Sequence, residues 1–127
     1  MPWYPQMRHT LRVTASRLAD MEYQQRAWVR GDVPPGSVDS FDLAVHFIYD
    51  DTSLAEGAVD CIGWYVRNAE EATLIDELVG ALEVLFSVHG TTESDAHYLG
   101  SEEWAGVVAS AKRLCEVLCQ EEDESSC

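Results

Sequence analysis

Residues 69–88, AEEATLIDELVGALEVLFSV, carry the strongest helical pattern in the chain and decide the fold. Apolar side chains recur there every three or four residues, at Leu74, Ile75, Leu78, Val79, Leu82, Leu85 and Phe86. A face of this width is typical of a helix that packs one side into a hydrophobic core. Asn68 followed by Glu71 resembles a capping box, and Gly90 is a stop signal. We therefore predict a helix over 69–88 at the centre of the core.

Helical spacing recurs on both sides of this central helix. It predicts a helix after Pro5, another over about residues 20–30, a third that Asp39 caps with Asp42 three residues later, and a last one from Ser101 to about residue 119. Residues 59–67, VDCIGWYVR, fit both a helix and a strand, and we favour a helix.

The segments between these helices are short, and GDVPPGS at 31–37 is the clearest loop. Short connections imply largely antiparallel neighbours. The predicted fold class is all-α, a compact single-domain bundle of five to six helices over residues 1–119. Residues 120–127, QEEDESSC, lack an apolar anchor and predict a disordered acidic tail.

The composition describes a globular chain that is large enough to bury one core without a metal or a disulfide. It has 127 residues, 46% of them hydrophobic, and no apolar run near the roughly 20 residues that cross a bilayer. The N-terminus lacks a secretory pattern, so we expect a cytoplasmic protein with reduced cysteines. Cys115 and Cys119 share a helical face but lack two further metal ligands, so we expect neither metal nor cofactor.

The net charge of −15 is unevenly distributed. Residues 1–36 carry five arginines against three acids, whereas residues 37–127 carry three basic residues against twenty acids. Such a surface repels phosphate, which argues against nucleic acid and anionic membranes, and it speeds encounter with a basic protein. The alternative is that the charge serves solubility alone.

One helical face combines Asp42, His46 and Asp50 at i, i+4 and i+8. Flanking carboxylates can orient an imidazole as a base or as a metal ligand. These three residues are the alternative catalytic centre, that of a small enzyme or a metal-dependent accessory protein of a biosynthetic pathway.

The pair Asp50-Asp51 lies near a helix C-terminus, where negative charge opposes the helix dipole. Asp51 can cap the turn that follows, which leaves Asp50 for an arginine or lysine. We favour an internal arginine over one from a partner. The acids that we expect to contact a basic partner are Asp50, Asp51, Glu70, Glu71, Glu102 and Glu103.

Three stretches, HFIYDDTSLA, IGWYVRNAEE and YLGSEEWAGVV, resemble a family of small acidic actinobacterial proteins of uncharacterised function. The resemblance covers about residues 21–118 and implies a compact helical domain, with no activity or site to carry over. In charge and size alone the chain is also similar to immunity proteins that neutralise basic toxin domains. We therefore expect a non-catalytic protein-binding domain of the immunity or antitoxin type. Self-association as a homo-oligomer, through Trp3 and Tyr4, is a third possibility.

Overall fold

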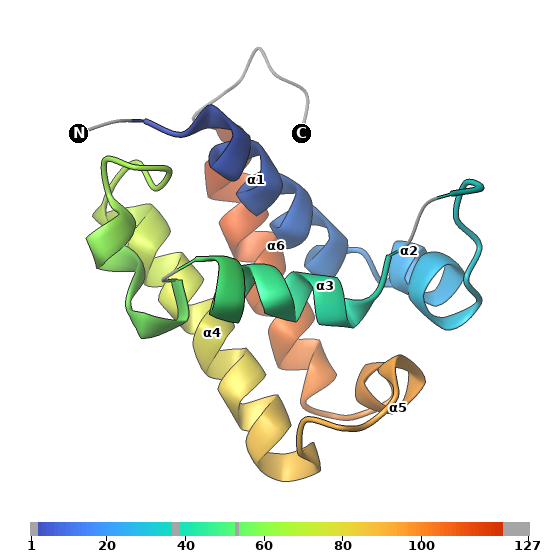
Figure 1. Cartoon of the computed structure of the whole chain (residues 1–127). Coiled ribbons are helices and arrows are strands. Elements are labelled where there is room, and N and C mark those ends of the chain that lie inside the picture. The colour runs from blue at the N-terminus through green and yellow to red at the C-terminus, as the bar shows by residue number, and fades with distance from the viewer. Residues whose placement is uncertain (1–2, 37–38, 53, 121–127) are drawn as a thin grey trace.

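The computed structural model of the chain is a bundle of helices (Figure 1). It describes residues 3–36, 39–52 and 54–120, apart from the side chains of residues 119 and 120. Within these ranges the α-helices are α1 (Pro5–Ala19), α2 (Met21–Tyr23), α3 (Phe41–His46), α4 (Ala69–His89), α5 (Asp95–Leu99) and α6 (Trp104–Gln120). α2 continues as π-helical turns over Gln24–Val29, and α3 does so over Phe47–Asp51. The predicted all-α class is confirmed.

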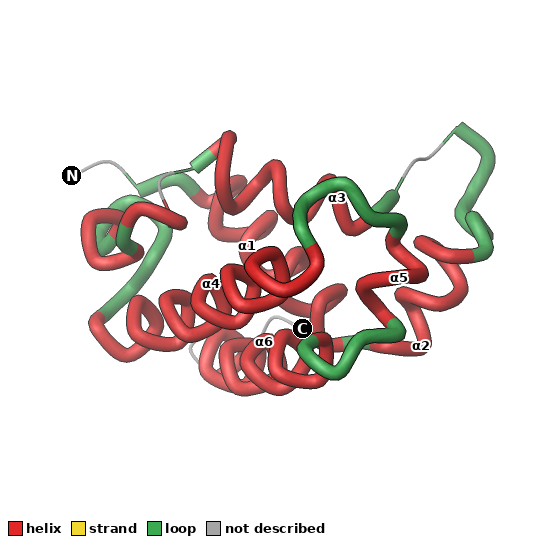
Figure 2. Tube along the Cα trace, turned by 90° about the horizontal axis from the view of Figure 1, so that it is seen from below, coloured by secondary structure: helices red, strands yellow, loops and turns green. Residues whose placement is uncertain are grey.

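The long helix α6 packs against both α1 and α4. α1 and α4 run in one direction and α6 returns between them, as the chain colours of Figure 1 show. The view from below in Figure 2 places α4 beside α6, with α5 in the connection between them. Among the described residues, an isolated bridge between Ile62 and Val66 is the one place where strand-like pairing occurs.

The core is built from the faces that the spacing predicted. α4 buries Ile75, Leu78, Leu82 and Leu85, each at most 3% exposed. Facing side chains come from α6 and α1, at Val107, Ala111, Leu114, Leu118, Leu11, Ala15 and Leu18. Because these positions recur every three or four residues, each helix contributes one continuous apolar face.

Both predicted ends of α4 are confirmed. The Asn68 side chain accepts a hydrogen bond from the Glu71 backbone N–H at 3.0 Å, and Gly90 follows the helix with φ +81°. The Glu71 carboxylate does not return to Asn68, as a full capping box requires. It accepts instead from the Arg67 N–H at 2.8 Å and pairs with Arg8.

The predicted cap at Asp39 is wrong. Ser40 occupies the N-cap position of α3, and the first N–H of the helix, that of Phe41, donates to the Asp95 carboxylate at 3.2 Å. The Asp39 carboxylate turns towards the preceding helix, where it accepts from Tyr23 Oη and, at 3.0 Å, from Trp28 Nε1. These two donors, in partly buried hydrogen bonds, outcompete a helix terminus that has another acid available.

The predicted helix over 59–67 is also wrong. A short 3₁₀ turn, Ala58–Cys61, begins the segment, and Ile62 then has extended backbone. Gly63 has φ +93°, which an ordinary helical residue cannot adopt, and the Cys61 carbonyl accepts the N–H of Trp64 at 3.0 Å. The alternation seen in the sequence therefore belongs to a tight turn before α4.

The last helix begins at Trp104, three residues after the predicted cap Ser101. The Ser101 hydroxyl donates instead to the Tyr98 carbonyl at 2.7 Å, at the end of α5. α5 itself, which Ser94 caps, is too short to show a periodic pattern. The predicted tail, apart from the end of α6 at Gln120, lies outside the described residues. Over the part of the chain that the structure describes, no helix is long and apolar enough to cross a membrane.

Candidate functional site

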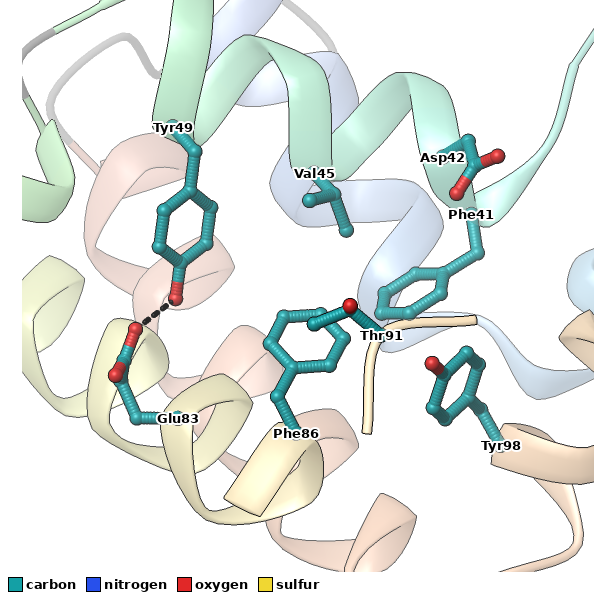
Figure 3. A pocket seen from close by; sticks show the side chains of 8 residues that line it. All are labelled: Phe41, Asp42, Val45, Tyr49, Glu83, Phe86, Thr91 and Tyr98. Atoms are coloured by element: carbon teal, nitrogen blue, oxygen red, sulfur yellow. Dashed lines mark hydrogen bonds between the residues drawn. The ribbon is translucent and has the colours of Figure 1, made fainter. Parts of the chain in front are cut away.

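A pocket of about 290 Å³ opens between α3, α4 and the segment that leads into α5 (Figure 3). Its lining consists of Phe41, Asp42, Val45, Tyr49, Glu83, Phe86, Thr91 and Tyr98. Most of the wall is aromatic or aliphatic, and the ionisable groups among the lining residues are Asp42, Glu83 and two tyrosines. A small apolar hollow with a few polar groups is the usual form of a binding site.

Each helix lines the pocket with side chains from one of its faces. Phe41, Val45 and Tyr49 follow one another at four-residue steps along α3 and its π-helical continuation. Glu83 and Phe86 are three residues apart on α4, and Figure 3 shows both turned towards α3. Thr91 and Tyr98 complete the wall from beyond the end of α4.

Four aromatic rings pack together in this wall. The Phe86 ring lies in the middle, with its centroid 6.0 Å from that of Phe41, 6.3 Å from Tyr49 and 5.8 Å from Tyr98. Phe41 is anchored from behind by Trp104, whose ring is 5.0 Å away and nearly perpendicular. Edge-to-face packing of this kind fixes ring orientation, so the pocket is preformed.

The Tyr49 hydroxyl donates to the Glu83 carboxylate at 2.5 Å across the pocket (Figure 3). Burial raises the pKa of Tyr49 well above its ordinary value, and the hydrogen bond and the negative charge of Glu83 raise it further. The phenol therefore stays protonated and continues to orient Glu83 throughout the neutral range.

Acidic charge also accumulates at the other end of the pocket. Asp42 is exposed there, on the first turn of α3, and half-buried Asp95 accepts the Phe41 N–H. Burial raises the pKa of Asp95, the hydrogen bond from Phe41 opposes that rise, and the charges of Asp42 and Asp39 add to it. Of these acids Asp42 lines the pocket, and Asp95 lies next to it through its hydrogen bond from Phe41.

A second polar cluster joins the C-terminus of α4 to α5 and α6. His89 Nε2 lies 2.7 Å from Glu103 Oε1, and His89 Nδ1 lies 3.0 Å from His97 Nε2. His97 Nδ1 is 3.7 Å from Glu93. The hydrogen bond with His89 lowers the pKa of Glu103. Because the two rings share a hydrogen bond, this cluster holds the loop beside Thr91 in place.

The structure brings together two of the three residues in the alternative catalytic centre. His46 Nδ1 is 3.0 Å from Asp50 and 3.9 Å from Asp51, with both partners of each pair more than half exposed. Asp42 forms no ion pair within the described residues and lines the pocket instead. The helix changes to π-helical geometry at Phe47, which alters the angular relation that an eight-residue spacing assumes.

The expected internal arginine for the Asp50-Asp51 pair is wrong for the described residues. The side chain beside both carboxylates is that of His46. Arg17 pairs with Asp39 instead, at 3.5 Å. The surplus charge at this corner of the surface is therefore exposed to solvent.

The six expected contact acids fall into three groups. Asp50, Asp51, Glu70 and Glu102 are exposed, and Glu103 is half-buried against His89. Glu71 is fully buried and paired with Arg8. A partner cannot reach it in this structure, so Glu71 is corrected from a contact acid to a structural one. Its position in the first turn of α4 hid that role, because acids are favoured there in any case.

Sequence reasoning missed the pocket, and above all Tyr49, Glu83 and Phe86. Their joint role depends on α3 lying across α4, which no local pattern encodes. The available signal was the four-residue series Phe41, Val45, Tyr49, which lies beside the buried Ala44 and Ile48 and widens the apolar face of this helix.

The described cysteines, Cys61 and Cys115, and the N-terminal aromatic residues take structural positions. Burial, and then the charge of Glu116, raises the pKa of the Cys115 thiol to about 11. No cluster of three or more candidate metal ligands occurs within the described ranges, and the side chain of residue 119 lies outside them. Tyr4 stacks on Trp64 at 5.5 Å, and Trp3 lies near the guanidinium groups of Arg8 and Arg67. Self-association through them stays a prediction.

Comparison with known families identifies the chain. It belongs to a family defined by a domain of unknown function, DUF7945, whose model matches residues 1–126. This confirms the expected membership of a family without an assigned activity. No curated protein and no solved structure matches the chain significantly.

Proposed function

We propose that this chain is a non-catalytic cytoplasmic domain that binds a basic protein, of the immunity or antitoxin type, with a toxin domain as the partner. We place its relatives among small acidic actinobacterial proteins, on the three stretches that carry that resemblance. The observation that carries the proposal is the charge of the elements around the pocket. α3 with its π-helical continuation, α4 and α5 contain nine acidic residues and no lysine or arginine.

One-signed charge over neighbouring elements has a definite physical consequence. It raises the local concentration of cations and speeds the encounter with a positively charged protein, while it repels nucleic acid and anionic lipid. Exposed acids on these elements, such as Asp50, Asp51 and Glu70, form no ion pair with a lysine or arginine in the described part of the chain. They are therefore available to a basic surface.

The test begins with affinity capture of the tagged chain from its own cells and identification of what it binds. The purified binary complex is then measured by calorimetry at low and at physiological salt. We expect a basic partner and an affinity that falls as salt rises, because exposed charges are screened. An acidic partner, or an affinity that ignores ionic strength, contradicts the proposal.

Charge-neutralising variants then locate the contact surface. The paired change Asp50→Asn with Asp51→Asn, and separately Glu70→Gln and Glu102→Gln, each remove negative charge from exposed positions. We expect association to slow in those variants that face the partner. Unchanged association in every variant argues that the acidic surface serves solubility alone.

The 3.0 Å contact between His46 and Asp50 favours a second candidate, a small enzyme or a metal-dependent accessory protein. In it, Asp50 orients the imidazole, which then acts as a base or a ligand. Metal analysis of the purified protein and the variant His46→Ala test this candidate. Absence of bound metal together with unchanged cellular function in the variant removes it.

A further inference from the structure

We infer that the pocket between α3, α4 and Thr91 receives one cationic side chain, a lysine or an arginine, from the basic protein partner. This inference rests on the proposed function and names the point at which the partner is recognised.

The size of the pocket fits a single side chain. Its volume of about 290 Å³ lies just below the roughly 300–1,000 Å³ that sites for whole small molecules span. Its walls are set by rings that pack against one another, so a side chain can enter without rearrangement of the helices.

The walls match the stem of a long cationic side chain. Val45 and Phe86 offer apolar surface along which methylene groups can pack. The rings of Tyr49, Phe86 and Tyr98 also line the pocket, and an aromatic face attracts a cation that comes within about 6 Å of its centroid. A purely apolar side chain gains only the first of these two interactions.

The mouth of the pocket selects for positive charge. Asp42 and Glu83 are exposed and come from different helices, and Figure 3 shows them at opposite ends of the pocket. The Tyr49 hydroxyl holds Glu83 through Oε2, which leaves Oε1 for a second donor. No lysine or arginine is among the lining residues, so an entering cation meets two carboxylates and no competing positive charge.

The experiment uses the full chain and three short peptides. Each is a capped pentapeptide of four glycines around a central lysine, arginine or norleucine. Backbone amide shifts of the isotope-labelled protein are followed by NMR during titration. We expect the lysine and arginine peptides to shift the signals of Val45, Phe86 and Thr91, and the norleucine peptide to bind at least about tenfold more weakly.

Matched variants separate the pocket from the general charge of the surface. Glu83→Gln and Glu70→Gln remove the same charge from the same helix, thirteen residues or about 20 Å apart. We expect Glu83→Gln to weaken the affinity for the lysine peptide about fivefold or more, and Glu70→Gln to leave that affinity within twofold of the parent value. Thr91→Phe keeps the charge but fills the exposed mouth, so it should abolish the shifts; circular dichroism checks that it folds.

Equal losses of affinity for the lysine peptide in Glu83→Gln and Glu70→Gln overturn the inference, and so does equal affinity for the norleucine and lysine peptides. Absence of any shift at the pocket does so as well. A salt-sensitive basic partner that binds the Thr91→Phe variant normally leaves the proposed function intact while this inference fails. Pocket binding of the cationic peptides without any basic partner in the cell contradicts the proposed function, and the inference about the partner's side chain then fails with it.

Discussion

Arg8 and Glu71 form a buried, two-pronged ion pair that ties the first turns of α1 and α4 together. Arg8 Nη1 lies 2.5 Å from Glu71 Oε1, and Nη2 lies 2.9 Å from Oε2. The two side chains are 4% and 0% exposed. Arg8 also donates to the Tyr65 carbonyl, and Glu71 accepts from the Arg67 N–H, so the turn before α4 is held by the same pair.

Replacing Glu71 by glutamine should destabilise the fold strongly. It leaves the guanidinium of Arg8 buried opposite a neutral group, and removal of one partner of such a pair costs about 3–5 kcal/mol. Urea unfolding measures the change, and Glu70→Gln is the matched control, one residue away and exposed. Similar losses of unfolding free energy in both variants would show that the pair contributes nothing beyond helix charge.

Gln24 joins three elements through its buried side chain. Its Nε2 donates to the carbonyls of Arg17 and Leu18 at 2.8 and 2.9 Å, and its Oε1 accepts from Trp104 Nε1 at 2.9 Å. Gln24→Leu leaves these groups without their partner, and each buried unsatisfied group costs about 1–3 kcal/mol.

The neighbouring change Gln25→Leu alters an exposed position and is the control. Thermal unfolding should show a lower Tm for Gln24→Leu and little change for Gln25→Leu. A Gln24→Leu protein as stable as the parent would mean that apolar burial compensates for the lost hydrogen bonds.

Two glycines, Gly80 inside α4 and Gly90 directly after its end, should respond to alanine in opposite ways. Gly90 has φ +81° and ψ −175°, a region that is almost restricted to glycine, so Gly90→Ala should cost about 1–3 kcal/mol. Gly80 lies inside the helix with open space around its missing Cβ, so Gly80→Ala should stabilise by about 0.5–1 kcal/mol. Denaturant midpoints check both, and a stabilising Gly90→Ala would contradict the backbone geometry.

The lowered pKa of Glu103 predicts a pH dependence of defined sign. Its hydrogen bond with His89 favours the carboxylate in the folded state. The resulting stability is fully present above the ordinary value near 4.5 and is lost as pH falls through the lower folded pKa. The other ionisable groups facing this bond are His97 and, beyond it, Glu93.

Carboxyl carbon NMR measures this titration directly. The midpoint of Glu103 should lie below its ordinary value in the parent protein and should rise in His89→Gln. His97→Gln is the control, because it leaves the contact between His89 and Glu103 in place. A midpoint that does not respond to His89→Gln would show that another group holds the carboxylate.

The fold class and the long helices could be predicted because their signals are local. The apolar face of α4 repeats every three or four residues, and the groups that end it, Asn68 and Gly90, lie within one turn of its ends. Proline at the start of α1 works in the same way, since its missing N–H is not needed there. Such interactions depend only on neighbours in the chain.

The candidate site could be predicted only in part. The sequence pointed to Asp42 and to the contact between His46 and Asp50, which lie on one helix at four-residue spacing. It gave no indication that Asp42 shares a pocket with Glu83 and Phe86, which are more than forty residues away. The prediction for residues 59–67 was wrong for a related reason, because Gly63 with its positive φ and the hydrogen bond from the Arg67 N–H to Glu71 of α4 decide that turn.

By itself the sequence determined where the long helices lie, which face of each is apolar, and how strongly negative the second part of the chain is. Tertiary structure alone decided that Glu71 is buried against Arg8, 63 positions away, while Glu70 beside it faces water. It also decided that four aromatic rings from three helices meet in one pocket. Periodicity fixes the direction of a side chain relative to its own helix, whereas its partner depends on how the helices cross.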